Sequence, residues 1–317
     1  MKRFQGIEAR DLKMTNLKDE MDEHGYVMIR GLLPLDHLNS LLSDITYLLK
    51  DLSWINSESD SLERIATVFS ACAEGDELYK TAYDRIFNLQ SFHSFPHHSL
   101  LQDTMKLLAG SELLVHPKTM ARLIFPSFER GVIHAHQDHT AIGGDEESFT
   151  AWIPLHDCPV VQGPLRILEG SHRFGLQPIT VETGYIAPGM ERGNEWVEGN
   201  INAGDVLFFH SLTVHEALPN RSNRLRISLD CRFQNYKRPV DPSALVFTGK
   251  SRRSWEDVYN DWTSDELKYY WKKMPLELKP SIGELTELAE TAESLPMRAR
   301  YARILERIEE QLSVRST

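Results

Sequence analysis

The spacing of apolar residues divides the chain into three stretches. In residues 15–110 apolar side chains recur every three or four positions, and this period predicts amphipathic helices. The clearest helix begins near Pro34, and a similar pattern extends over residues 61–73. Helical spacing returns from about residue 253 to 312. We expect the apolar faces of both helical stretches to pack as core against the part of the chain that lies between them.

The middle stretch, residues 119–235, changes to short apolar or alternating runs, which predict strands over 120–125, 132–137, 149–155, 165–169, 206–210 and 225–233. Glycine and proline turn signals separate these runs. Short strands joined by turns are typical of a jelly roll. We therefore predict one domain over residues 1–317, with a mainly β core of the double-stranded β-helix (cupin-like barrel) type and flanking helices. The glycine-rich residues 172–203 interrupt the strands, and we expect this long loop to border the substrate entrance.

Composition narrows the classes of function. The chain has 317 residues, of which 41% are hydrophobic and 26% charged, as in an ordinary globular protein. Its net charge of −11 argues against nucleic acid as a partner, because such binding needs a basic face. No apolar run is long enough to cross a membrane. Cys72, Cys158 and Cys231 are far apart and form no Cys-x-x-Cys motif, which predicts a reduced, cytoplasmic protein.

Candidate metal chemistry lies in residues 131–140, which hold three histidines and one aspartate. His136 and Asp138 are two positions apart, so in an extended strand both side chains point to one face. A third ligand must come from a distant segment, and His215 follows His136 by 215 − 136 = 79 residues. Two histidines and one carboxylate form the facial triad of non-haem Fe(II) oxygenases. Zinc hydrolases use the same residue types in a His-Glu-x-x-His motif, which this chain lacks.

Arg226 follows His215 by 226 − 215 = 11 residues, on a predicted strand. A planar guanidinium can bind a carboxylate with two hydrogen bonds, as the far end of a metal-chelating dicarboxylate requires. A salt bridge between Arg226 and Asp230 is the structural alternative. His210 competes with His215, because it too is followed eleven residues later by an arginine, Arg221, although in a turn-like context.

The two other histidines of the motif compete with His136. His134 shares the strand face of His136 but has no carboxylate two positions on, and His139 would lie on the opposite face from Asp138. We interpret both as pocket wall or polar surface. The pair of His136 and Asp138 could itself be an exposed pair on a turn, and it is His215 and Arg226 that favour metal binding.

Several passages resemble the phytanoyl-CoA dioxygenase family of Fe(II)/2-oxoglutarate-dependent oxygenases. They are His136-Gln137-Asp138, residues 151–155 with 162–166 and 170–173, residues 204–215 with 219–222, Arg226, and the N-terminal residues 23–34. The resemblance spans about residues 15–235. It implies Fe(II) held by His136, Asp138 and His215, and it selects His215 over His210. It also implies 2-oxoglutarate bound by Arg226, with Trp152 and Gln137 beside it, and O2 as the second co-substrate.

The resemblance further implies oxidation of a small organic substrate with release of succinate and CO2. Related halogenases replace the carboxylate ligand with a small residue, so Asp138 favours hydroxylation or another C–H oxidation. We take His134, Arg173 and Trp196 as candidate substrate contacts. The alternatives are a cupin-type metal enzyme that does not use 2-oxoglutarate and a non-catalytic binding protein on the same barrel. The last helix, from about Pro296 to Leu312, is expected to pack on its own domain, with a homodimer through it as the alternative.

Overall fold

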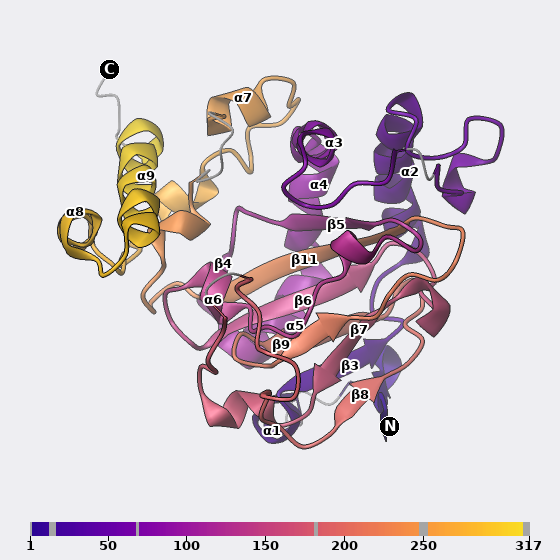
Figure 1. The fold of residues 1–317 in the computed structure, drawn as a ribbon, viewed down its shortest axis with the longest axis horizontal. Helices are drawn as coiled ribbons and strands as arrows, with labels where there is room; N and C mark the ends of the chain where they lie inside the picture. The colour runs from indigo at the N-terminus through magenta and orange to yellow at the C-terminus, as the bar shows by residue number, and fades with distance from the viewer. Residues whose placement is uncertain (1, 13–16, 68–69, 181–182, 247–252, 313–317) are drawn as a thin grey trace.

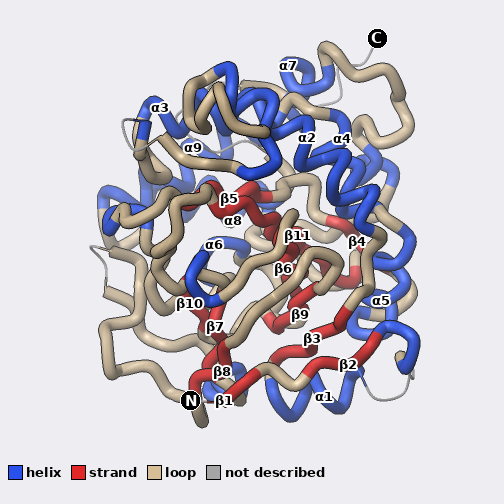
Figure 2. The backbone as a smooth tube through the Cα atoms, turned by 90° about the vertical axis from the view of Figure 1, so that its right-hand side faces the viewer, coloured by secondary structure: helices blue, strands red, loops and turns tan. Residues whose placement is uncertain are grey.

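The computed structural model describes residues 2–12, 17–67, 70–180, 183–246 and 253–312. Within them, two β-sheets face each other as in a jelly roll (Figures 1 and 2). The larger sheet follows the order β2, β3, β9, β6, β11 and β4, with β5 also paired to β11. Its strands are β2 (Gly6–Glu8), β3 (Tyr26–Arg30), β4 (Leu113–Val115), β5 (Met120–Ile124), β6 (Ser148–Pro154), β9 (Val206–His210) and β11 (Arg226–Asn235).

The smaller sheet has the order β1, β8, β7 and β10. Its strands are β1 (Lys2–Arg3), β7 (Leu165–Leu168), β8 (Trp196–Glu198) and β10 (His215–Ala217). Figure 2 shows these short strands on one side and the strands of the larger sheet on the other. Apolar side chains of both sheets, among them Trp152, Ile167 and Phe209, meet in one buried cluster between the sheets. The predicted mainly β, jelly-roll core is therefore confirmed.

The long strand β11 has two chemically different faces. Ile227, Leu229, Cys231 and Phe233 belong to the large core cluster that also contains the helices. The alternate positions face the space between the sheets, because Asp230 pairs directly with Trp152 of the inner cluster. These inward residues are Arg226, Ser228, Asp230, Arg232 and Gln234, and none is more than 9% exposed. The barrel interior thus carries a buried polar and charged stripe.

Helices cover the outer face of the larger sheet. They are α1 (Leu17–His24), α2 (Leu35–Asp51), α3 (Glu77–Phe87), α4 (Gln90–Ser94) and α5 (Ser99–Ala109). Their buried leucines and aromatic residues join the outward side chains of β6, β9 and β11 in the main core. The prediction of helices packed as core on one side of the barrel is confirmed for this stretch. Among the described residues, no helix is both long and apolar enough to cross a membrane.

Two predicted elements are wrong. The described part of residues 61–73 contains the 3-10 helix Ser61–Glu63 but no α-helix, because Arg64 adopts a left-handed conformation and Ala66 donates a backbone hydrogen bond to Asn223. Contact with the segment before β11 therefore overrides the helical pattern. Residues 132–137 form no regular strand, and His136 makes only an isolated bridge to His215.

The C-terminal helices are α7 (Trp255–Tyr259), α8 (Ile282–Thr291) and α9 (Leu295–Leu312), and Figure 1 shows α8 and α9 together at one end of the molecule. Ile304 and Ile308 of α9 are buried in the main core together with Leu285 of α8. The last helix thus packs on its own chain, and a homodimer through it stays a prediction.

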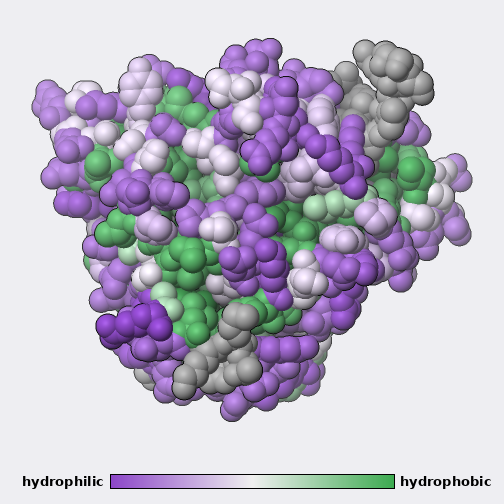
Figure 3. Space-filling view, turned by 180° about the vertical axis from the view of Figure 1, so that it is seen from behind, coloured by the Kyte–Doolittle hydropathy of each residue, from purple (hydrophilic) through white to green (hydrophobic). Residues whose placement is uncertain are grey.

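On the face seen in Figure 3, apolar areas gather toward the middle and hydrophilic side chains surround them.

Candidate metal centre and co-substrate site

Three side chains from separate segments converge between the two sheets. His136 precedes the short helix α6 (His139–Ile142), Asp138 is the N-cap of that helix, and His215 is the first residue of β10. The backbones of His136 and His215 donate hydrogen bonds to each other's carbonyl groups, both at 3.0 Å. Their candidate ligand atoms all lie within 4.8 Å of one another. The Nε2 atoms of His136 and His215 lie 4.0 and 3.9 Å from Asp138 Oδ1, leaving room for one ion between them.

The hydrogen bonds of the two histidines define which ring nitrogen can bind a metal. Nδ1 of His136 lies 2.7 Å from the carbonyl oxygen of His134, and Nδ1 of His215 lies 3.0 Å from that of Thr213. A carbonyl oxygen only accepts, so Nδ1 carries the proton and Nε2 presents its lone pair. Burial, helped by the neighbouring His215, lowers the pKa of His136 to about 3. This histidine is therefore neutral near pH 7, as a ligand must be.

Asp138 is only 3% exposed, and both of its oxygens have partners. The hydroxyl of Thr150 donates to Oδ2 at 2.5 Å, and Nη2 of Arg232 donates to Oδ1 at 3.3 Å. Burial alone would raise the pKa of this carboxyl, but Arg232, the two histidines and the Thr150 hydrogen bond together hold the pKa well below its usual value. Asp138 is therefore ionised and can bind a cation.

Arg226, the first residue of β11, is fully buried, and within the described chain none of its three guanidinium nitrogens has a hydrogen-bond partner. Its guanidinium carbon lies 5.7 Å from the ring centre of Trp152, whose indole nitrogen is also unpaired. The alternative salt bridge is wrong, because Asp230 instead accepts from Nε of Arg122 at 2.8 Å. A buried cation without a partner is costly, so this guanidinium fits the far carboxylate of 2-oxoglutarate.

Gln137, between His136 and Asp138, uses its side-chain amide for backbone hydrogen bonds. Its amide nitrogen donates to the carbonyl oxygens of Leu212 and Gly175, at 2.6 and 2.9 Å, and its amide oxygen accepts from the backbone of Gln177. These bonds use the whole amide group and tie the loop that follows β7 to the segment between β9 and β10. These bonds give Gln137 a structural role, and its position beside the co-substrate stays a prediction.

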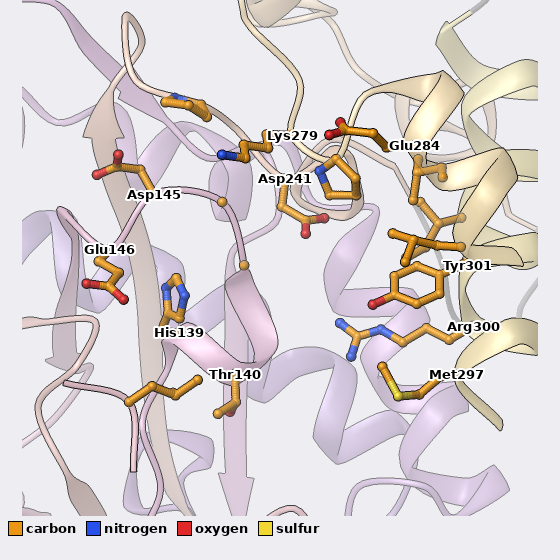
Figure 4. Close-up of a pocket in the computed structure, with 18 of the residues that line it drawn as sticks. His139, Thr140, Asp145, Glu146, Asp241, Lys279, Glu284, Met297, Arg300 and Tyr301 are labelled. Carbon is orange, nitrogen blue, oxygen red and sulfur yellow. The ribbon is translucent and has the colours of Figure 1, made fainter. Parts of the chain in front are cut away.

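The competing histidines lie outside the triad. His210 accepts a hydrogen bond from the backbone of Leu212 and lies 3.7 Å from the carboxylate of Glu147. His139 lines a separate cavity of about 1070 Å³ between α6 and the C-terminal helices. Figure 4 shows its ring directed into this cavity, with Asp241 nearby and Arg300 on the facing wall. The interpretation of His139 as a pocket wall agrees with this placement.

The three candidate substrate contacts differ in position. His134 is exposed, with its ring centre 5.4 Å from that of Tyr185, and Arg173 is also exposed. Trp196 pairs with Leu168 on the face of the small sheet opposite His215, and Arg166 stacks over its ring at 4.4 Å. Trp196 is therefore turned away from the metal ligands, because strand register sets its face.

Tyr185 is a neighbour of the triad that the sequence motifs did not indicate, as are Thr150 and Arg232, which bond to Asp138. Its ring centre lies 5.8 Å from that of His136 and 5.4 Å from that of His134. It belongs to the loop of residues 172–203, which was predicted to border the substrate entrance. The sequence indicated Tyr185 only as an aromatic residue within a glycine-rich loop. No spacing rule relates it to the His-x-Asp motif, since the loop folds back over about fifty residues.

Three features define a non-haem Fe(II)/2-oxoglutarate oxygenase: two facing sheets, a His-Asp-His triad between them, and a buried arginine on the inner face that has no hydrogen-bond partner among the described residues. The model of the phytanoyl-CoA dioxygenase family, PhyH, matches residues 21–228, and the chain belongs to this family. The co-substrates of this family are 2-oxoglutarate and O2, and its metal is Fe(II).

Among curated proteins, the 1-deoxypentalenic acid 11-beta-hydroxylase of Streptomyces exfoliatus is 28% identical over 233 residues, which are 67% of this chain and 78% of the relative. A phytanoyl-CoA dioxygenase of Arabidopsis thaliana is 30% identical over 103 residues, 30% of this chain and 36% of the relative. Among solved structures, the epimerase SnoN with Fe3+, alpha ketoglutarate and nogalamycin RO has a TM-score of 0.54 at 21% identity, covering 72% of this chain and 85% of its own. The carbocyclase SnoK has a TM-score of 0.52 at 21% identity, covering 74% and 88%. These two structures show the same fold.

Proposed function

We propose that this oxygenase hydroxylates a C–H bond of a small organic substrate. The observation that carries the proposal is the pairing of a compact His136–Asp138–His215 triad with the buried, unpaired guanidinium of Arg226 on the inner face of the same barrel. The Asp138 carboxylate supports hydroxylation over halogenation, and the hydroxylases among the relatives support the same outcome. A cupin-type enzyme that does not use 2-oxoglutarate would not need a buried arginine that has no anionic partner among the residues the structure describes.

The side chains have two roles, to bind the metal and to position the co-substrate. His136, Asp138 and His215 would hold Fe(II), and Arg226 would bind the distal carboxylate of 2-oxoglutarate across from Trp152. When bound, iron supplies the activation of O2 that is coupled to decarboxylation of 2-oxoglutarate to succinate and CO2. Three protein ligands leave coordination positions open for these co-substrates. The packed walls between the sheets keep bulk water away from the reacting centre.

Tyr185 and His134 border the exposed side of His136, so we assign the approach of the substrate to this side. The Streptomyces relative acts, by its name, on 1-deoxypentalenic acid, which supports a small-molecule substrate for this chain. Cys72, Cys158 and Cys231 are buried and unpaired in the structure, which supports a cytoplasmic location.

An anaerobic titration with Fe(II) and 2-oxoglutarate tests the proposal. We expect a weak visible charge-transfer band that requires both components, and Arg226→Met should need far more 2-oxoglutarate to develop it. With both components and O2 present, the wild-type protein should form succinate. A protein that binds metal but develops no band would favour the cupin-type alternative.

A further inference from the structure

We propose that Arg232 and Thr150 form a cross-strand clamp that holds the Asp138 carboxylate in its metal-binding orientation before the metal arrives, and that this clamp sets the metal affinity. The proposal rests on the function proposed above, because it concerns the same metal ligands. It adds two positioning residues that the metal-binding motif does not contain.

The clamp follows from the register of the larger sheet. Arg232 of β11 and Thr150 of β6 are direct partners in antiparallel pairing, so their side chains stand next to each other on the inner face. Each takes one oxygen of Asp138: Thr150 donates to Oδ2 at 2.5 Å and Arg232 to Oδ1 at 3.3 Å. Because both oxygens are engaged, the carboxylate cannot rotate without breaking a hydrogen bond.

The clamp also selects which oxygen faces the metal. Oδ1 is the oxygen that lies 4.0 Å from Nε2 of His136 and 3.9 Å from Nε2 of His215. Oδ2 instead accepts the hydrogen bond from the hydroxyl of Thr150. Asp138 is therefore poised as a ligand through a single oxygen, which leaves more coordination positions open than a bidentate carboxylate would.

Burial makes the clamp necessary. Thr150 is fully buried, Asp138 is 3% exposed and Arg232 is 9% exposed, so water cannot replace the missing partners of the carboxylate. A buried carboxylate requires a counter-charge and hydrogen bonds when no metal is present. Arg232 supplies this counter-charge to Asp138, whereas Arg122 on the same inner face pairs with Asp230 and Glu74.

Two effects of Arg232 on the metal oppose each other. Its positive charge repels a divalent ion, whereas its hydrogen bond keeps Asp138 oriented toward the ion. The orientation effect dominates, because Arg232 is paired with Asp138 and loss of a hydrogen bond to a ligand typically weakens metal binding by about 10- to 100-fold. If Arg232 and Thr150 act as a clamp, removing either one should weaken metal binding. If Arg232 only balances the charge of Asp138, neutralising it should tighten metal binding.

The test is a titration of the full-length protein with Co(II) alone, in competition with a chromophoric chelator and with the visible bands of bound Co(II) as a second readout. Arg232→Met and Thr150→Val should each weaken binding by about 10- to 100-fold. Thr150→Ser keeps the hydroxyl and should bind within about threefold of the wild type, since it preserves the bond to Oδ2. The double variant should lose less than the product of the two single effects, because both act on one carboxylate.

Arg85→Met is the control: it removes an arginine from an exposed pair with Asp51, between α3 and α2 and not bonded to the triad, and its Co(II) affinity should equal that of the wild type. Unchanged or tighter binding by Arg232→Met would overturn the clamp, as would equal affinities of Thr150→Val and Thr150→Ser. If Arg232→Met does not fold, the near-isosteric pair at Thr150 decides alone. If Co(II) binding depends on the clamp but added 2-oxoglutarate never changes the visible bands of bound Co(II), the clamp is supported and the proposed function is contradicted. A wild-type protein that binds no Co(II) would refute both.

Discussion

Replacing Arg226 with methionine should change co-substrate binding and protein stability in opposite directions. The guanidinium is fully buried, and none of its nitrogens has a partner in the described part of the chain. Burial also lowers its pKa, which reflects the cost of the charge at this position. In the ligand-free protein Arg226 is therefore a source of instability, and it gains its partner only when a carboxylate binds.

The magnitudes follow from these contacts. Two charge-assisted hydrogen bonds to a carboxylate, at about 1.5–3 kcal/mol each, amount to about 3–6 kcal/mol. At 1.4 kcal/mol per factor of ten, Arg226→Met should weaken 2-oxoglutarate binding by about 10²- to 10⁴-fold. Replacement of a buried charge by a packed apolar side chain commonly stabilises a protein by about 1–4 kcal/mol. We expect the ligand-free variant to unfold at a higher temperature than the wild type.

Thermal unfolding with and without Fe(II) and 2-oxoglutarate measures both effects. A ligand at about 100 times its Kd stabilises a protein by about 2.7 kcal/mol, so the wild type should shift upward on addition of 2-oxoglutarate while the variant should not. Arg122→Met is the control with the opposite sign, because it breaks the 2.8 Å pair with Asp230 and leaves that carboxylate buried without its partner. We expect it to destabilise the protein by about 3–5 kcal/mol. A ligand-free Arg226→Met protein that is less stable than the wild type, and that still responds to 2-oxoglutarate, would refute the reasoning.

Three further predictions concern the metal ligands, protein stability at acid pH and the substrate entrance. Asp138→Ala should abolish metal-dependent succinate formation, whereas Trp196→Ala, on the far face of the small sheet, should retain it; equal activities of the two variants would exclude Asp138 as a ligand. Burial lowers the pKa of His93 and His116 to about 4 and that of His136 to about 3, all below the unfolded value of 6.5. The unfolded chain thus binds more protons below pH 6.5, and each histidine should remove up to about 1.4 kcal/mol of stability per pH unit toward pH 4. Urea unfolding at pH 7, 6 and 5 measures this loss, and a constant free energy of unfolding would contradict it. Tyr185→Ala should leave Co(II) affinity unchanged but increase 2-oxoglutarate consumption without substrate, because its ring borders His136; a large loss of metal affinity would show that the ring instead supports the ligand.

The sequence alone determined the chemistry of the site and the class of fold. The short apolar runs of residues 119–235 predicted the strands of the jelly roll, since side chains alternate along a strand wherever it lies in the sheet. The residue types of His136, Asp138, His215 and Arg226 indicated iron and a dicarboxylate, because coordination and bidentate hydrogen bonding depend on the groups themselves.

The tertiary structure alone decided which side chains meet. His136 and Asp138 converge through the turn into α6 and the bridge to His215, not through the strand that their spacing suggested. Trp196 lies on the sheet face opposite His215, while Arg232 and Thr150 reach the triad through pairing between strand positions that are 232 − 150 = 82 residues apart. Register between distant strands sets these faces, and a shift of one residue would reverse them. Local sequence carries no information about that register, because the contacts that fix it form only when the whole barrel is assembled.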